Sequence, residues 1–496
     1  MSVVNEKSSD VAVVERHEDI AVTQDGSVLE DHVDPAVDKR LRWKLDLIIL
    51  PLVGTIYFLA SMSRSDLANA KSAGMAKDLH LTAHQYSNLA TAFLIGYIAF
   101  QLPGTIFIRK IRAPFQFAFA LVGWGTCVAL CAVCKNYSQL FAVRFLIGGF
   151  EAFVQGVVFY LSFWYTYDEL VLRGAIFFAT SSLAGAFNGL IAYGVLIDMN
   201  GRNGLKAWQW LYIIEGVLSI GFGFIVLFIL PATPESSPKW LFSELEVRAA
   251  VLRSRRSHNA VDSKLRWRLL YTPLLEVKFW LLAAMYAGSH YAVASLSNFL
   301  PSIIIGFGYS IVKSQLMTVI VYACALVAVL TFGYLADRMR TRGIFVIICS
   351  VLGGIGYILL LVLHGSGARL AATCILIMGI FPTIPLILTW TTVNLAGYTK
   401  RGASLALVNI VSQLFAISGT QAYHDPPLYR KGNASALGLV AFMGICAVVL
   451  SWYLRFLNKK KAAFRDSLTA EELDALRRSQ SLDIVGDGHV DFVYGY

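Results

Sequence analysis

The stretch LAATCILIMGIFPTIPLILTWTTVNLAGYT, residues 370–399, contains no aspartate, glutamate, lysine or arginine. A helix needs about 20 apolar residues to cross the hydrocarbon core of a bilayer, and this stretch is longer than that. Inside lipid the backbone has to satisfy its own hydrogen bonds, which favours a helix over an open strand. Residues 370–399 therefore predict a membrane-spanning helix.

Uncharged stretches of similar length recur along the chain, at 113–134, 174–197, 314–336, 344–368 and 402–423. The sequence of 496 residues is 56% hydrophobic and only 15% charged, with a mean hydropathy of +0.60. A soluble domain carries about 25% charged residues. The composition therefore predicts an all-α membrane protein whose main surroundings are the lipid bilayer.

Hydropathy predicts twelve transmembrane helices in two six-helix halves. The expected spans are 47–63, 84–107, 114–134, 139–162, 174–197, 208–230, 276–299, 314–336, 344–363, 370–391, 403–423 and 435–456. The expected organisation is a disordered, acidic N-terminal tail (1–38), a first half (39–230), a charged central loop (231–275), a second half (276–457) and a C-terminal tail (458–496).

Lysine and arginine gather in the short loops on one side of the predicted bundle. These basic residues are Arg109, Lys110, Arg112, Arg338, Arg340, Arg342, Lys400, Arg401, Lys459, Lys460 and Lys461. Cytoplasmic loops carry such an excess, so we expect this side and both termini to be cytoplasmic. The net charge of +10 reflects the same bias and does not indicate nucleic-acid binding.

Two full charges lie inside the apolar stretch RFLIGGFEA, residues 144–152. Arg144 and Glu151 are seven positions apart, which places them on one helix face but roughly 10 Å apart along the axis. They are therefore not expected to pair with each other. Charged residues inside spans are costly and usually face a bundle interior or a water-filled path. The alternative is that both sit in interhelical ion pairs that only hold the bundle together.

A few other side chains are candidates for a binding site at bundle depth. Arg64 closes the first span, Glu215 lies early in the sixth, and His290 is the only histidine inside a span. The neutral candidates for substrate binding are Tyr57, Asn188, Asn298 and Trp390. For any one neutral residue, an interhelical hydrogen bond is the simpler interpretation.

The sequence contains no nucleotide-binding loop, no metal-ligand spacing and no nucleophile with a matching base. We therefore expect no enzyme activity, no metal and no cofactor. The central loop 231–275 is too short for a nucleotide-binding domain, so ATP is not the expected energy source. What remains is movement of a solute by rocking of two halves around a midplane site.

The stretch GYLADRMRTRG, residues 333–343, resembles the loop between spans eight and nine of the major facilitator superfamily. RFLIGGFEA resembles the arginine motif in span four of the same superfamily, which implies the major facilitator fold. In this resemblance Gly333 permits close helix packing. Asp337, Arg338 and Arg342 act as a conformational gate that holds a neighbouring helix in one state of the cycle.

Shorter stretches are similar to the fungal allantoate-permease branch of the anion:cation symporter family. They are RSDLANAK (64–71), WLYIIEG (210–216), LPATPE (230–235), NLAGYTKR (394–401) and DPPLYRKG (425–432). This resemblance implies proton-coupled uptake of a small organic anion across the plasma membrane, by a monomer. It makes Arg64 and Arg144 candidate anion contacts, since a guanidinium matches carboxylate geometry. Glu151 and Glu215 become candidate proton carriers.

The sequence departs from that branch at two places where a substrate cavity is expected. The usual aspartate before Arg64 is Ser63, and the usual asparagine after it is Asp66. Residues 151–156, EAFVQG, lack the usual proline. Two alternatives stay open: a major facilitator exporter or antiporter of a small metabolite or toxin, and a nutrient-sensing receptor without net flux. Span five, with SLAGAFNG at 182–189, lacks the proline motif common in such antiporters, which argues against export.

Overall fold

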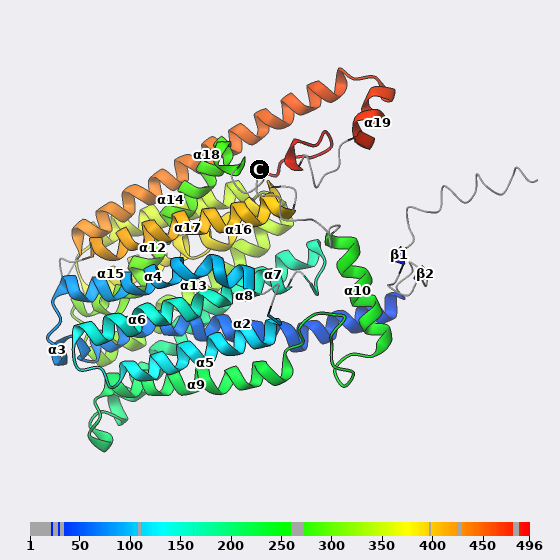
Figure 1. Ribbon diagram of the computed structural model, residues 1–496. Coiled ribbons are helices and arrows are strands. Elements are labelled where there is room, and N and C mark those ends of the chain that lie inside the picture. Colours follow the sequence, from blue (N-terminus) through cyan, green and yellow to red (C-terminus); the bar gives the residue numbers. More distant parts are fainter. Residues whose placement is uncertain are drawn as a thin grey trace, which may run out of the picture.

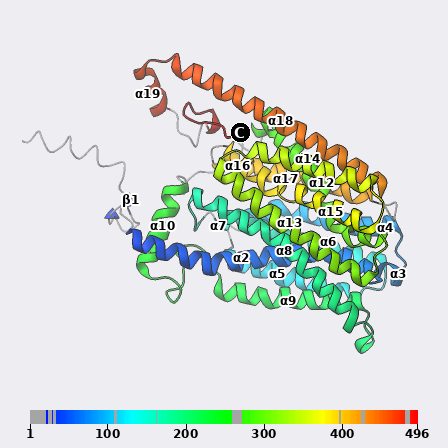
Figure 2. The same ribbon diagram turned by 180° about the vertical axis from the view of Figure 1, so that it is seen from behind.

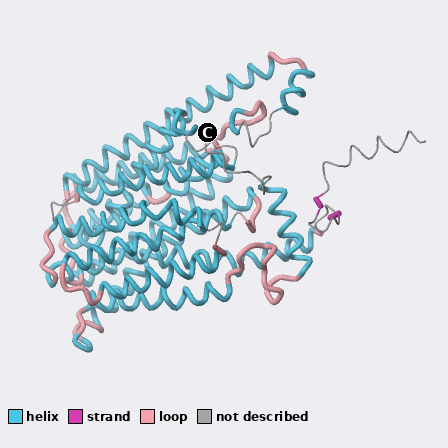
Figure 3. The backbone as a smooth tube through the Cα atoms, viewed as in Figure 1, coloured by secondary structure: helices cyan, strands magenta, loops and turns pink. Residues whose placement is uncertain are grey.

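The computed structural model describes residues 21–22, 28–29, 34–107, 111–161, 163–258, 272–395, 398–423, 429–479 and 486–496. Arg109, Lys110 and the side chains of Gln155 and Arg401 lie outside the described residues. Two short strands, β1 (Ala21–Val22) and β2 (Val28–Leu29), pair antiparallel ahead of the helices. Within the described ranges, almost all of the chain is helical (Figure 3).

The first half contains α2 (Pro35–Ser72), α3 (Met75–Asp78), α4 (Ala83–Phe107), α5 (Ala113–Cys131), α6 (Tyr137–Ala152), η1 (Phe153–Gly156), α7 (Val157–Leu161), α8 (Tyr167–Asp198), η2 (Arg202–Gly204) and α9 (Ala207–Ile229). The connection holds α10 (Glu244–His258) and η3 (Thr272–Leu275). The second half contains α12 (Val277–Gly306), α13 (Ile311–Met339), α14 (Arg342–Val362), α15 (Ser366–Ile380), α16 (Thr383–Val393), α17 (Tyr398–Ala422) and α18 (Arg430–Asp466), followed by α19 (Ala470–Ser479) and η4 (Gly486–Gly488).

The predicted all-α fold is confirmed, because every expected span coincides with a helix or a pair of helices (Figures 1 and 2). By length and apolar composition alone, 9 helices or helix pairs of the described ranges qualify as membrane spans. The expected spans 84–107, 139–162 and 276–299 are helical but are not among them. In the second of these, α6 is only 16 residues long and gives way to η1 after Ala152.

Several helices extend beyond the lengths that hydropathy predicts, α2 and α18 the furthest. Helix α2 begins at Pro35, inside the expected tail 1–38, because Asp34 caps it by accepting a hydrogen bond of 2.9 Å from the Ala36 amide. Proline at the first helical position has no amide to leave unpaired, so it favours this start. Helix α18 continues to Asp466, beyond the expected end of the last span.

The bundle has two ends, which we name by the chain. The termini end is where α2 begins and α18 ends, and the far end is where α2 ends and α4 begins (Figure 1). Hydrogen bonds join the two halves at the far end: Tyr86 Oη donates to the Asn298 carbonyl (2.8 Å), Gln315 to Ser72 (3.3 Å), and Gln421 to Asn88 (3.0 Å) and Thr91 (2.8 Å). These contacts close the far end in this conformation.

Helix α10 of the central connection is held against the start of α2 by ion pairs. Glu246 is 1% exposed and accepts a hydrogen bond of 2.7 Å from Lys44 and another of 2.9 Å from the Ser243 amide. On the same helix, Arg253 pairs with Asp38 of α2. The central connection is therefore not a loose loop throughout.

We expect Glu246→Gln to loosen α10 from α2. Burial raises the pKa of Glu246, but the hydrogen bonds from Lys44 and Ser243 outweigh it, so its pKa lies below the usual value. A lowered pKa means that this contact stabilises above the unfolded pKa of about 4.3 and is lost as the pH falls through the folded pKa. Limited trypsin digestion of residues 231–275 at neutral pH should be faster in the variant. Equal cleavage of variant and wild type would contradict the assigned contact.

Candidate functional site

Two of the predicted site residues form an ion pair between α2 and α6, both of which belong to the first half of the chain. Arg64 Nε donates to Glu151 Oε1 at 2.6 Å, and Arg64 Nη2 contacts the same oxygen. The Glu151 side chain is 1% exposed, whereas that of Arg64 is 32% exposed. Arg144 and Glu151 have different partners and form no pair with each other among the described residues, as their spacing predicts.

Aromatic side chains surround the Arg64 guanidinium. It lies 5.3 Å from the ring centre of Tyr97 and 5.8 Å from that of Phe93, both on α4. Tyr57 lies seven residues before Arg64 on α2, about two helical turns away, and interacts electrostatically with Arg64 and Glu151. A cation over such rings is stabilised without a second carboxylate.

Helix α12 of the second half completes this group. Tyr286 and His290 both lie within electrostatic range of Arg64. Their rings are 4.2 Å apart, and His290 Nδ1 lies 3.2 Å from the Tyr286 carbonyl oxygen. The structure thus pairs the predicted residues Arg64 and Glu151 directly, whereas His290 of the second half interacts with the charge of Arg64 only at longer range, with no direct contact among the described residues.

Arg144 lies in a separate and fully buried group. It is 2% exposed, donates to Tyr212 Oη on α9 at 2.9 Å, and approaches the Ser63 carbonyl at 3.5 Å. Among the described residues no carboxylate forms an ion pair with it, and its Nε has no hydrogen-bond partner. Arg144 is therefore a buried cation whose charge is compensated at longer range.

Asp66 lies close enough to Arg144 for a longer-range electrostatic interaction, but the two form no ion pair among the described residues, and Asp66 Oδ2 has no hydrogen-bond partner. It is 1% exposed and accepts a hydrogen bond of 2.8 Å from Asn188, which also donates to the Met62 carbonyl at 3.0 Å. Asn188 therefore positions Asp66 on the buried side of α2. Asp66 was not among the predicted site residues, although the sequence shows it in place of the asparagine that is usual in the similar family.

Glu215 of α9 is a buried carboxyl group without partners. It is 2% exposed, and neither of its carboxylate oxygens has a hydrogen-bond partner among the described residues. A buried charge without a partner is strongly unfavourable, which keeps Glu215 a candidate for binding a proton. It is one turn beyond Tyr212, the residue that holds Arg144.

Two further predicted binding residues, Asn298 and Trp390, lie in neither the Arg64 group nor the Arg144 group. Asn298 donates to the Ala294 carbonyl of its own helix at 2.8 Å and takes part in the far-end closure through its carbonyl. Trp390 is 0% exposed, and its Nε1 donates to the Gly495 carbonyl at 2.8 Å. Sequence reasoning instead missed Tyr97 and Tyr286, since tyrosines inside spans are common and nothing in their spacing singles them out.

The predicted gate lies where α13 gives way to α14, at the termini end. Arg342 Nη2 lies 3.2 Å from Asp337 Oδ1, whereas Arg338 donates to Tyr334 of its own helix at 3.3 Å. The expectation for Gly333 is wrong, because a Cβ there would meet nothing within 4 Å. The closely packed glycine of this motif is Gly343, where a Cβ would lie 2.9 Å from the Trp390 ring.

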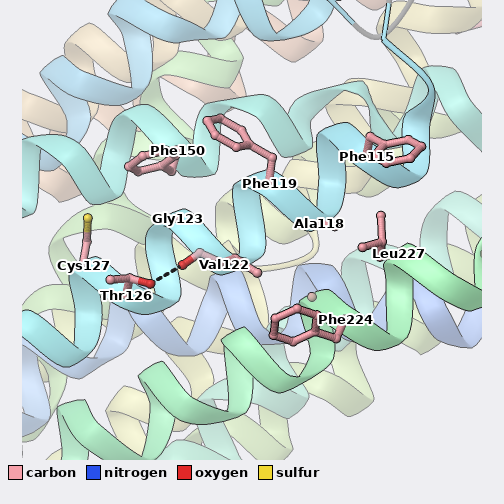
Figure 4. Close-up of a pocket in the computed structure, with 11 residues that line it drawn as sticks. Phe115, Ala118, Phe119, Val122, Gly123, Thr126, Cys127, Phe150, Phe224 and Leu227 are labelled. Carbon is pink, nitrogen blue, oxygen red and sulfur yellow. Dashed lines mark hydrogen bonds between the residues drawn. The ribbon is translucent and has the colours of Figure 1, made fainter.

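An apolar groove with a volume of about 510 Å³ lies on the first half of the chain (Figure 4). It is lined by α5, α6 and α9, including Phe119, Phe150 and Phe224, and contains none of the predicted site residues. Phe119 and Phe224 are 58% and 51% exposed, as expected for side chains that face lipid. This groove is therefore not the candidate site. No group of three or more histidine, cysteine or acidic residues in the described ranges could hold a metal ion.

Comparisons with known proteins agree with this architecture. The sequence matches the Major Facilitator Superfamily over residues 53–420. It is 31% identical to the high-affinity nicotinic acid transporter of Saccharomyces cerevisiae over 467 residues, which covers 93% of this chain and 86% of that protein. It is 30% identical to the major facilitator-type transporter hxnP of Emericella nidulans over 446 residues, covering 87% and 88%.

Solved structures show the same fold at low sequence identity. A bacterial homologue of the human lysosomal transporter Spinster, inward-facing and unoccupied, matches with a TM-score of 0.61 at 14% identity, covering 81% of this chain and 95% of that one. The proton:xylose symporter XylE matches with a TM-score of 0.61 at 15% identity, covering 82% and 95%. The relatives are membrane transporters with the fold described here. The chain belongs to the major facilitator superfamily.

Proposed function

We propose that this protein takes up a small organic anion together with a proton, by alternating access. The observation that carries the proposal is the Arg64–Glu151 ion pair, in which a partly exposed guanidinium meets a carboxylate that is almost fully buried. Tyr286 and His290 of the second half lie near it. A midplane site between two halves is where such carriers bind substrate.

The pair suggests how anion and proton are coupled. Protonation of Glu151 removes its charge and frees Arg64 from its partner. The guanidinium then offers its forked donors to the carboxylate of a substrate, which matches them in geometry. When the proton leaves, Glu151 competes again for Arg64 and favours release. Proton and anion therefore travel in the same direction.

Arg144 and Glu215 belong to the same proposal as a second guanidinium and a second proton carrier. Both are sealed in this conformation, in which the far end is closed. They become accessible only as α2, α6 and α9 change their packing during the cycle. Asp337 and Arg342 form a gate at the termini end.

Arg144→Ala is expected to abolish uptake with the protein still at the cell surface. The substitution leaves Tyr212 and Asp66 without the cation that both face, so the α2–α6–α9 contact reorganises. Arg144→Lys keeps the charge but loses the planar fork and should also transport poorly. Uptake is measured at matched surface expression, with exposed Arg248→Gln as the control. Normal uptake by Arg144→Ala would remove Arg144 from the mechanism.

The proposal also states which end of the bundle faces the cytoplasm and in which membrane the protein lies. Basic loops place the termini end in the cytoplasm. The far end then opens to the outside of the plasma membrane, and the protein works as a monomer. The relative named for nicotinic acid transport supports a small carboxylate as the substrate class.

The decisive experiment is uptake of a panel of labelled small carboxylates into cells that express the protein. It is run at acidic and at neutral outside pH, with and without a protonophore. Accumulation that acid stimulates and the protonophore abolishes supports the proposal. Lower intracellular compound than in control cells would indicate export. Ligand binding without flux would indicate a receptor.

A further inference from the structure

Residues 486–496, GDGHVDFVYGY, pack against the second half at the termini end, and we call them the docked segment. In Figures 1 and 2 this red segment lies beside the end of α16 and under α18. Val490 and Tyr494 are only 7% and 6% exposed. A segment beyond the last span thus has its own buried side chains.

Asp487 anchors the docked segment in a cluster of lysines. It pairs with Lys278 of α12, and its Oδ1 lies 2.5 Å from Lys400 Nζ of α17. Lys278 and Asp487 each have 5% of their side chain exposed. Tyr494 Oη adds a hydrogen bond of 3.0 Å to Asp487 Oδ2. Both lysines also pair with Glu276, so Asp487 supplies the second carboxylate of this cluster of buried charges.

The backbone of the docked segment is held as specifically as its side chains. Lys461 of α18 donates to the carbonyls of Asp487 (2.6 Å), His489 (2.9 Å) and Phe492 (3.1 Å). The Asn458 side chain makes two hydrogen bonds of 2.9 Å with the backbone of Tyr494. Asn394, the residue directly after α16, pairs in the same way with Gly495, at 2.9 and 3.0 Å. Paired amide contacts of this kind recognise an extended peptide at a fixed register.

The docked segment therefore ties together the termini ends of α12, α16, α17 and α18. The junction between α16 and α17 carries three of its partners: Trp390, Asn394 and Lys400. Alternating access requires the helix ends at one side to approach the opposite half as the other side opens. A brace across this junction resists that movement.

We propose that the docked segment is an intramolecular ligand that holds the carrier in the conformation closed at the far end, and that its release lets the far end open. The effect on transport rests on the proposed function, whereas docking and far-end opening do not. Only a state that binds the segment is stabilised by it, so losing the segment shifts the population toward the other state.

The test compares Asp487→Asn with Asp491→Asn in the full chain. Asp491 is a matched control in the same segment, because its ion pair among the described residues is with exposed Arg477 of α19 and not with a membrane-spanning helix. Docking is measured through Val490→Cys, by its rate of maleimide labelling in purified protein. Far-end opening is measured through Ser72→Cys, since Ser72 lies at the contact between the halves. Native cysteines are corrected for with the unmodified chain.

With Asp487→Asn we expect labelling at position 490 and at position 72 to rise by about tenfold each, as a 1.4 kcal/mol loss of docking would give. Asp491→Asn should leave both rates unchanged. Unchanged labelling at position 490 would overturn docking, and faster labelling there without a change at position 72 would overturn the brace. Asn458→Ala, which breaks the contact with Tyr494 without removing a charge, serves as the second variant if Asp487→Asn fails to fold.

A transport measurement then separates this inference from the proposed function. If a substrate is found, the initial uptake rate should be several-fold higher in Asp487→Asn and the same as wild type in Asp491→Asn. If no carboxylate is taken up, the labelling results still decide whether the segment docks and holds the far end closed.

Discussion

Arg64→Gln is expected to abolish anion uptake. Glutamine keeps a polar side chain, although a shorter one, but removes the cation that pairs with Glu151 and that the proposal assigns to the substrate. Truncating one partner of a buried, hydrogen-bonded charge pair costs about 2–5 kcal/mol. Uptake should therefore fall by about 30-fold or more, measured as the initial rate at matched surface expression.

A second variant distinguishes lost substrate binding from a damaged fold. Glu151 is buried and would be left without a partner in Arg64→Gln, so the double variant Arg64→Gln with Glu151→Gln removes both charges at once. We expect the double variant to regain the surface level of wild type and still not to transport. Recovery of uptake in the double variant would show that the pair only holds helices together. That is the alternative raised by the sequence.

Glu151→Gln alone is expected to make the rate of anion uptake independent of the outside pH. The neutral amide imitates the protonated carboxyl permanently, so Arg64 is free for the anion whatever the outside pH. Initial uptake should lose its acid stimulation, with the ratio of acidic to neutral rates falling toward one. Accumulation against a gradient should also fail, because no proton is carried through this position.

The control for Glu151→Gln is Glu215→Gln, the same change at the other buried carboxyl group. Glu215 has no hydrogen-bond partner among the described residues, so its substitution leaves no cation unpaired. If Glu215→Gln alone removes the pH dependence and Glu151→Gln keeps it, the proton path runs through α9 and the coupling at Arg64 is wrong. Exposed Glu235→Gln should behave as wild type.

The architecture followed from the sequence because lipid leaves a chain few choices. Uncharged stretches of about 20 residues must form helices, and each of the expected spans is occupied by helix. The expected boundaries were less exact. The Asp34 cap sets the start of α2, and α18 continues through polar residues to Asp466. Hydropathy marks only apolar stretches and therefore predicts neither boundary.

The candidate site was only partly predictable. The cost of burying charge singled out Arg64, Arg144, Glu151 and Glu215, and all four are on helices of the first half. Which of them pair was not predictable, because partners on different helices share no sequence spacing. Asn298 and Trp390 were grouped with the site, but the structure engages one in the far-end contact and the other with the docked segment.

The sequence alone therefore determined that the chain lies in a membrane, that its spans are helices, and which few charges the bundle has to accommodate. Each of these depends on the local cost of placing a residue in lipid. Only the tertiary structure decided that Arg64 meets Glu151, that Arg144 faces Tyr212, and that Asp487 binds lysines of α12 and α17. These contacts join residues from 68 to 209 positions apart, and such distances are closed by helix packing rather than by any local pattern.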